Sequence, residues 1–157
     1  MERFMELYQT VYKDLYRLAY YYMGNSQDAE DVVQDATLSA YEHFGRLRAE
    51  EAFRPWIFKI LVNHCRRYGR KRKLREQSME QLPEEPFEAE HSSRTELEEL
   101  LSSLSEEERL IVTLTVFGGY KGEEIAGILH KNHSTIRSKY RRALKKLEAR
   151  YRQEVRE

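Results

Sequence analysis

The residues best suited to chemistry in this sequence are cations gathered on its last predicted helix. A short predicted helix with an apolar cluster, 123–129, is followed by the turn His130-Lys131-Asn132 and by a second predicted helix over 133–152. Two helices joined by so short a turn, with the small Ala126 where they cross, are typical of a helix-turn-helix. Such a second helix lays its first turns against base edges in the major groove, while flanking cations hold phosphates. The candidate residues for this contact are Ser134, Thr135, Arg137, Ser138, Arg141, Arg142 and Lys145.

A second group of cations lies in the middle of the chain. Residues 59–75 contain eight basic side chains and no acidic one, within a helix that we predict to run from about Phe53 to Lys73. The first half of this helix is apolar enough to join a core, whereas the second half is too basic to be buried. That half therefore needs either water or a phosphate backbone against it.

The net charge of zero conceals a strong segregation of charge along the chain. Residues 1–75 carry 14 basic and 10 acidic side chains, residues 76–108 carry 1 and 12, and residues 109–157 carry 12 and 5. Two basic blocks on either side of an acidic one indicate a chain that meets a polyanion at two places.

Helical periodicity accounts for nearly the whole chain, so the sequence predicts an all-α fold. Apolar residues recur every three or four positions along the first 22 residues, as on one face of a helix. Four tyrosines at a spacing of four residues run beside that face, and we expect this stripe to lie in the core or at its edge. They are Tyr8, Tyr12, Tyr16 and Tyr20.

One segment interrupts the helical pattern and divides the chain. Residues 76–92 contain two of the three prolines and no basic residue, which is typical of a flexible acidic linker. We therefore expect two small helical domains, 1–75 and 93–157, joined by this linker.

Catalytic and cofactor chemistry finds little support in the sequence. The chain has no G-x-x-x-x-G-K-[ST] loop, no H-E-x-x-H motif and no other glycine-rich phosphate loop. Cys65 directly follows His64, but adjacent positions of a helix point about 100° apart. His130 and His133 lack further metal ligands beside them. We therefore predict a protein that is not an enzyme and that holds no metal and no other cofactor.

The remaining compositional features concern the compartment. A single cysteine excludes a disulfide framework. No stretch approaches the roughly 18–20 consecutive apolar residues that a membrane span needs. The first residues show no basic region that leads into an apolar run, as a secretory signal would. We therefore expect a cytoplasmic protein without insertion into a membrane.

Three stretches, in this order along the chain, resemble RNA polymerase sigma factors of the extracytoplasmic-function group. They are NSQDAEDVVQDATLSAYEHF at 25–44, FRPWIFKILVNHCRRYGRKRK at 53–73 and GGYKGEEIAGILHKNHSTIRSKYRRALKKL at 118–147. The first two correspond to region 2 of that family and the third to region 4. The resemblance covers nearly the whole chain. It implies a sigma factor that binds core RNA polymerase, recognises minus-ten and minus-35 promoter elements and aids strand opening.

The resemblance also implies roles for individual residues. The residues that would grip the clamp helices of the largest polymerase subunits are Asp31, Gln34, Asp35 and Leu38. The residues that would contact minus-ten DNA are Arg48, Phe53, Asn63, Arg66, Arg67, Arg70 and Lys71. The seven residues named on the last helix would read and clamp the minus-35 element. The implied partners are core RNA polymerase, through its clamp helices and flap, promoter DNA, and an anti-sigma factor that holds the protein at the inner membrane face.

Two other interpretations stay open from the sequence. A stand-alone helix-turn-helix regulator would bind DNA without polymerase, although it has no reason to carry the stretches at 25–44 and 53–73. A divergent sigma-like activator of toxin or bacteriocin genes would share the mechanism but differ in promoter choice.

The helix-turn-helix departs from the family pattern at two places. His130 and Lys131 stand where a glycine and an apolar residue are usual, and Lys121-Gly122 stands where a hydroxyl residue is usual. The resemblance therefore leaves the minus-35 sequence preference open.

Overall fold

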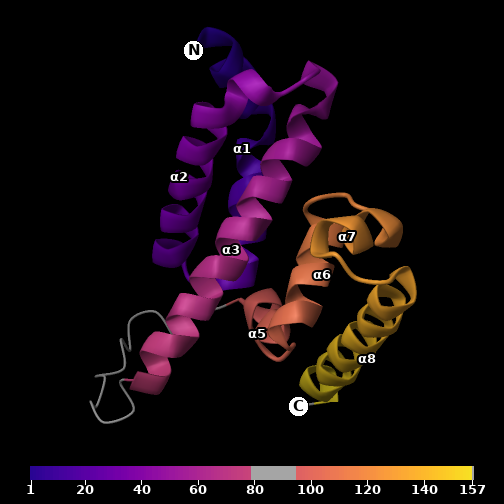
Figure 1. The fold of residues 1–157 in the computed structure, drawn as a ribbon. Helices are drawn as coiled ribbons and strands as arrows, with labels where there is room; N and C mark the ends of the chain where they lie inside the picture. Colours follow the sequence, from indigo (N-terminus) through magenta and orange to yellow (C-terminus); the bar gives the residue numbers. More distant parts are fainter. Residues whose placement is uncertain (79–94, 157) are drawn as a thin grey trace.

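The computed structural model describes residues 1–78 and 95–156, and these residues form helices joined by short turns (Figure 1). The α-helices are α1 (Glu2–Met23), α2 (Ser26–His43), α3 (Phe53–Ser78), α5 (Glu96–Ser102), α6 (Glu106–Val116), α7 (Gly122–Leu129) and α8 (His133–Arg156). Two short 3-10 turns, η1 (Phe44–Arg46) and η2 (Glu50–Ala52), connect α2 to α3. The all-α prediction is confirmed for the described residues.

The third helix is longer than the sequence predicts. It ends at Ser78 rather than near Lys73, so the first three residues of the predicted linker are helical. The rest of the predicted linker, 79–92, lies outside the described residues, and its acidic composition therefore stays a sequence observation.

The turn between α1 and α2 follows from local chemistry. Gly24 ends α1 in the left-handed region, with φ 88°, and its N–H donates to the carbonyl oxygen of Tyr20. The side chain of Asn25 then caps α2 by accepting a hydrogen bond of 2.8 Å from the N–H of Asp28. A glycine at this position and an Asn cap are the residues that such a boundary favours.

Helices α1, α2 and α3 pack side by side as a three-helix unit, which we call the first unit (residues 1–78). Its fully buried side chains include Leu18, Phe58 and Leu61. Cys65 is also fully buried, and burial raises the pKa of its thiol well above the ordinary range. A buried, protonated thiol is a core group rather than a nucleophile.

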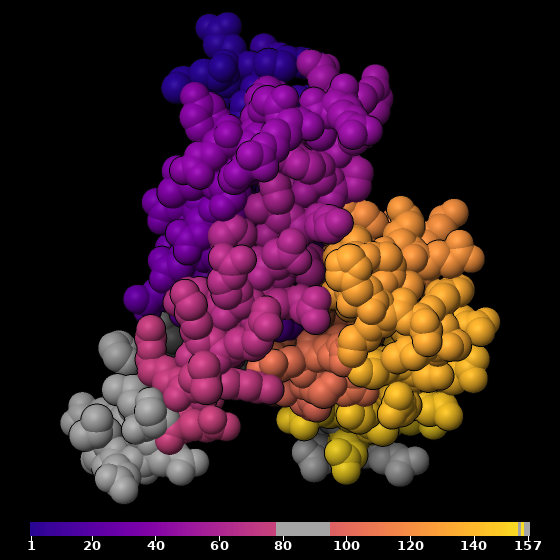
Figure 2. Space-filling model, viewed as in Figure 1, coloured from indigo at the N-terminus to yellow at the C-terminus, as the bar shows by residue number. Residues whose placement is uncertain are grey.

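Helices α5 to α8 form the second unit (residues 95–156), which packs against the first. Ser105 and Glu108 make a capping box at the start of α6. The buried face of α6, with Leu110, Ile111 and Leu114, joins the same hydrophobic cluster as the core of α1–α3. Figure 2 shows the second unit seated against the lower half of α3. The two units thus share one core in this structure.

Candidate nucleic-acid and partner interfaces

The outer face of α8 carries the residues predicted to contact the minus-35 element. Six of the seven are exposed, and Thr135 is half-buried. None of them forms an ion pair with a carboxylate within the described residues; Arg142 donates only to the carbonyl oxygen of Ser138 on its own helix, at 3.5 Å. Unpaired cations on one exposed helix face are what a phosphate backbone requires.

The inner face of α8 uses its lysines differently. Lys139 pairs with Glu107, and Lys146 pairs with Glu108 at 2.7 Å, so both ammonium groups are held against α6. Lys131, in the helix-turn-helix turn, pairs with Glu107 at 2.5 Å. These carboxylates thus fix α8 and the turn on α6 and leave the outer cations free.

The pKa of Glu108 reflects its ion pair with Lys146. Burial raises the pKa of its carboxyl, but the hydrogen bonds from Lys146 and from Ser105 outweigh burial and bring the pKa to about 2. The same balance, with Lys131 and Lys139 as donors, lowers the pKa of Glu107. Both side chains are therefore ionised at neutral pH and act as fixed counter-charges.

The two departures from the family pattern lie at the two ends of α7. His130 ends α7 in the left-handed region, with φ 56° and ψ 46°, a conformation that glycine adopts without strain. A Cβ at Gly122 would lie only 3.0 Å from Nε2 of His133, so the missing side chain makes room for that ring. His130 therefore holds a strained backbone conformation, whereas Gly122 leaves room for the His133 ring.

The basic half of α3 divides into free and engaged cations. Asn63, Arg67, Arg70 and Lys71 are exposed and Arg66 is half-buried, whereas Arg48 is exposed in the turn before η2. Two other cations of α3 are used in packing. Arg72 donates to Asp28 and to the carbonyl oxygen of Met23, both at 3.0 Å, and Lys73 pairs with Glu106 at 3.3 Å.

Phe53 corrects the sequence prediction. Its side chain is only 2 % exposed and packs among aromatic rings, with its centroid 5.8 Å from that of Phe4 and 5.9 Å from that of Trp56. A ring in this position holds the start of α3 to α1 and cannot reach DNA while the helix is folded. We therefore remove Phe53 from the candidate minus-ten residues.

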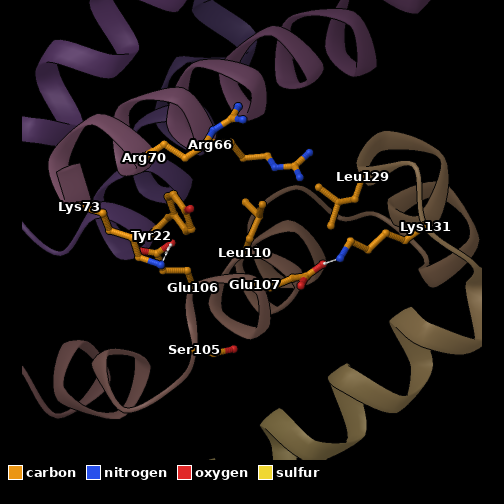
Figure 3. Close-up of a pocket in the computed structure, with 10 residues that line it drawn as sticks. All are labelled: Tyr22, Arg66, Arg70, Lys73, Ser105, Glu106, Glu107, Leu110, Leu129 and Lys131. Carbon is orange, nitrogen blue, oxygen red and sulfur yellow. Dashed lines mark ion pairs between the residues drawn. The ribbon is translucent and has the colours of Figure 1, made fainter.

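A pocket of about 410 Å³ lies between α3 and the second unit (Figure 3). Arg66 and Arg70 line it from α3, and neither forms an ion pair within the described residues. Across the pocket, the pairs Lys73–Glu106 and Lys131–Glu107 mark its two ends. The wall that faces the two arginines comes from α6, the end of α7 and the turn after it, so the second unit lies against part of the predicted minus-ten surface.

Two arginines hold the units together. The Nε of Arg109 on α6 donates to the carbonyl oxygen of Tyr22 at 2.8 Å, and its guanidinium lies over the Tyr22 ring at 5.4 Å. Arg54 on α3 donates to the carbonyl oxygen of Gly118 at 3.2 Å and pairs with Asp14 at 3.2 Å. The sequence offered no signal for either residue, because an isolated arginine on a helix looks like a solvated side chain.

Tyrosines at the end of α1 complete this contact. The ring of Tyr21 stacks on that of Phe117 with centroids 4.9 Å apart and an interplanar angle of 4°. The hydroxyl of Tyr20 donates to Glu98 at 2.7 Å, and this hydrogen bond, together with burial, raises the pKa of Tyr20 to about 12. One end of α1 therefore binds the second unit through Tyr21 and through Tyr20, which belongs to the stripe expected in the core or at its edge.

The exposed face of α2 carries the residues predicted to bind polymerase. Asp31, Gln34, Asp35 and Leu38 are all exposed, and Leu38 is 56 % exposed although it is apolar. Asp28, in the first turn of α2, is engaged within the bundle, where it holds Arg72 and accepts a hydrogen bond from Tyr68. The structure thus brings the four predicted residues together on one accessible surface.

Within the described residues, no group of three or more His, Cys, Asp or Glu side chains is arranged to hold a metal ion. In the same part of the chain, no helix has the length and apolar character needed to cross a bilayer.

Comparison with known proteins relates this geometry to a family. Residues 7–75 match the family model of sigma-70 region 2, and residues 94–147 match that of sigma-70 region 4. The chain is 34 % identical over 137 residues to the RNA polymerase sigma factor SigV of Bacillus subtilis. This match covers 85 % of this chain and 81 % of SigV. It is 33 % identical over 135 residues to the ECF RNA polymerase sigma-E factor of Escherichia coli, covering 75 % of this chain and 71 % of the other.

Solved structures share the fold. The sigma factor RpoE of Bartonella quintana, in complex with the anti-sigma factor NepR, superimposes with a TM-score of 0.78 at 24 % identity, over 95 % of this chain and 96 % of that one. CnrH, in complex with the cytosolic domain of CnrY, gives a TM-score of 0.68 at 24 % identity, over 95 % of this chain and 88 % of that one. With both family regions matched in order, the chain belongs to the extracytoplasmic-function group of the sigma-70 family and is a sigma factor that directs promoter-specific transcription.

Proposed function

We propose that this sigma factor divides its work among three surfaces. The exposed face of α2, with Asp31, Gln34, Asp35 and Leu38, binds the clamp helices of core RNA polymerase. The second half of α3 follows the minus-ten DNA, and the outer face of α8 binds the minus-35 element. In this proposal residues 1–75 and 93–157 act as the two functional domains, and the protein works in the cytoplasm beside the chromosome.

The observation that best supports the DNA-binding role is the division of cations on α8. Lys139 and Lys146 are neutralised by carboxylates of α6, whereas Arg137, Arg141 and Arg142 are exposed and unpaired among the described residues. A helix that needed its cations only for solubility would have no reason to sort them in this way. Counterions released from DNA on binding to the unpaired arginines supply the free energy of association.

The minus-ten role assigns phosphate contacts to Asn63, Arg66, Arg67, Arg70 and Lys71 on α3, with Arg48 in the preceding turn. Strand opening follows if unpaired bases are captured by the first unit, because such capture offsets an unstacking cost of a few kcal/mol per step. Tethering both units to one polymerase raises the effective concentration of each for its own element.

The contact between the units constrains this function. Arg66 and Arg70 line a pocket of about 410 Å³, which is far too small to admit a duplex, and the second unit forms its opposite wall. The minus-ten contact by these arginines therefore requires the two units to separate. An anti-sigma factor that favours the closed arrangement would keep the protein inactive and could hold it at the inner membrane face.

The test is co-elution of the full chain with bacterial core RNA polymerase, followed by run-off transcription from a promoter library. We expect a stable complex and promoter-dependent transcripts. Asp35→Arg should weaken polymerase binding and leave duplex binding intact, whereas Arg142→Ala should weaken promoter binding and leave the polymerase complex intact. Salt-sensitive duplex binding without any co-elution would instead identify a stand-alone DNA-binding regulator.

A further inference from the structure

The pocket between α3 and the second unit has the size and the position of a small-molecule site. Its volume of about 410 Å³ falls within the range of about 300–1,000 Å³ that such sites occupy, and they form preferentially where two packed units meet. Arg66 and Arg70 line it from α3, whereas Leu110 and Leu129 line it from the second unit (Figure 3). A ligand in this pocket therefore touches both units at once. We call this feature the interunit pocket.

The positive charge of the interunit pocket is concentrated on its α3 wall. Four basic and two acidic side chains line the pocket, which leaves two positive charges uncompensated. The pairs Lys73–Glu106 and Lys131–Glu107, at 3.3 Å and 2.5 Å, neutralise themselves. The two uncompensated charges are those of the α3 arginines, neither of which has an ion pair among the described residues. The pocket therefore favours a ligand with at least two negative charges, placed against α3.

The geometry of the α3 wall suits a phosphate chain. Arg66 and Arg70 stand four positions apart on one helix, so their Cβ atoms are separated by roughly 5–6 Å. A guanidinium group presents its donors in a planar fork that binds phosphate oxygens in pairs. The hydroxyl of Tyr22 adds a third donor between them, because a Cβ added at Gly69 would lie 3.6 Å from it. Burial raises the pKa of Tyr22 to about 12, so this hydroxyl keeps its proton at neutral pH.

The opposite wall suits the rest of a nucleotide. Leu110 and Leu129 are apolar and line the pocket from α6 and α7. Glu106 and Glu107 stand in the first turn of α6, so phosphates are repelled from this side and drawn to α3. Small-molecule sites commonly combine such an apolar wall with a few polar groups that fix the orientation of the ligand.

We infer that the interunit pocket binds a nucleoside triphosphate, with its phosphates on Arg66 and Arg70 and its base against the leucine wall. Because the two walls belong to different units, the complete site exists only in the closed arrangement, and the ligand holds that arrangement closed. Both arginines are also proposed minus-ten contacts, so a bound nucleotide withholds them from promoter DNA. This consequence rests on the proposed function, whereas the binding itself does not.

The test measures the affinity of the full chain for ATP and GTP by isothermal titration calorimetry. Arg66→Ala and Arg70→Ala should each weaken binding at least about tenfold, since each removes charge-assisted hydrogen bonds to phosphate. Lys59→Ala is the matched control, because Lys59 is an exposed cation of α3 that does not line the pocket. Its affinity should stay within about twofold of the wild type, a difference well below the loss of one hydrogen bond. Unchanged ATP and GTP affinity in both arginine variants would overturn the inference.

Inorganic triphosphate and adenosine separate the two halves of the ligand. Each should bind at least about tenfold more weakly than ATP, because each uses only one wall of the pocket. If inorganic triphosphate binds as tightly as ATP, the chain holds a phosphate chain alone and the assignment to a nucleotide is wrong.

A urea titration tests whether the ligand bridges the units. Energy transfer between a dye on α2 and a dye on α8 reports their separation. ATP at one hundred times its dissociation constant should raise the closed-to-open ratio by up to about 100-fold, so energy transfer should be lost at a higher urea concentration. Separation at an unchanged urea concentration would place the ligand on one unit only and overturn the inference.

The outcomes separate this inference from the proposed function. If the chain binds core RNA polymerase but neither ATP nor GTP at millimolar concentration, only the inference fails. If the arginine variants lose nucleotide affinity as expected while the wild-type chain does not bind core polymerase, the proposed function fails and the nucleotide site stands.

Discussion

Replacing Arg109 by methionine should loosen the second unit from the first. The guanidinium of Arg109 donates to the carbonyl oxygen of Tyr22 at 2.8 Å and lies over its ring at 5.4 Å. A hydrogen bond from a charged donor contributes about 1.5–3 kcal/mol, and the cation–π contact about 0.5–2 kcal/mol. Methionine keeps the apolar stem but loses both contacts, so we expect a weakening of about 2–5 kcal/mol. This corresponds to a shift of the closed-to-open ratio by a factor of roughly 30 to 4000.

Energy transfer between two dyes measures the closed arrangement directly. Cysteines introduced at Glu42 on α2 and Ala149 on α8, both exposed, carry the dyes. The native Cys65 does not compete for them, because it is fully buried and burial raises the pKa of its thiol. In a urea titration, Arg109→Met should lose energy transfer at a lower urea concentration than the wild type, and before its helical circular dichroism falls.

The control replaces an arginine that does not contact the first unit. Arg150 is exposed on α8 and forms no ion pair within the described residues, so Arg150→Met should follow the wild-type titration. Coincident titration curves for Arg109→Met and the wild type would refute the reasoning, since the contact with Tyr22 would then not hold the two units together.

Three further substitutions test single contacts by urea denaturation. Glu108→Gln should lower the free energy of unfolding by about 1–2 kcal/mol at pH 7, because it removes the charge paired with Lys146. The pKa of Glu108 in the folded protein, about 2, lies below the ordinary 4.5, so its carboxylate stabilises the fold fully above about pH 4.5 and loses this effect toward pH 2. The difference in free energy of unfolding between the variant and the wild type should therefore disappear as the pH falls over that range. His130→Gly should raise the free energy of unfolding by about 1 kcal/mol by relieving the left-handed conformation, and an unchanged value would argue against strain there. Gly118→Ala should lower it by roughly 1–3 kcal/mol, because its Cβ would lie 2.6 Å from the Tyr120 ring.

Helix boundaries were predictable because they depend on neighbours in the sequence. Gly24 and Asn25 at the turn between α1 and α2, and Ser105 with Glu108 at the start of α6, act within a few residues of where they stand. The helix-turn-helix follows from the same local logic. Helix α3 continues past the predicted end near Lys73 to Ser78, and arginine and lysine, which favour helices, are frequent in its last turns.

The packing of the two units could not be predicted, because it depends on residues far apart in the sequence. Arg109 contacts the carbonyl oxygen of Tyr22, 87 positions away, and Arg54 reaches Gly118, 64 positions away. The periodicity of a sequence does not predict a hydrogen bond between a charged side chain of one unit and a backbone carbonyl of the other. The relative placement of the units therefore had to come from the structure.

The tyrosine stripe shows how a correct pattern can support an incomplete interpretation. Positions four residues apart on an α-helix rotate by about 40° per step, so a stripe at this spacing winds away from the core. Tyr8 stays at the α2 contact, Tyr12 turns outward and Tyr20 reaches Glu98 on α5. The spacing predicted one face, but the same rotation distributes the four rings among packing, surface and domain contact.

The departures in the helix-turn-helix concern its scaffold rather than the proposed reading face. Lys131, which stands where an apolar residue is usual, pairs with Glu107, and that carboxylate also holds Lys139 on the inner face of α8. His133 lies against Gly122, where a larger residue would collide with its ring. Lys131 thus has a partner on α6, and Gly122 has the His133 ring as its neighbour. Under the proposed function, the minus-35 preference then depends on the outer residues of α8, and exchanging the α7–α8 turn for a family-typical one should leave that preference unchanged.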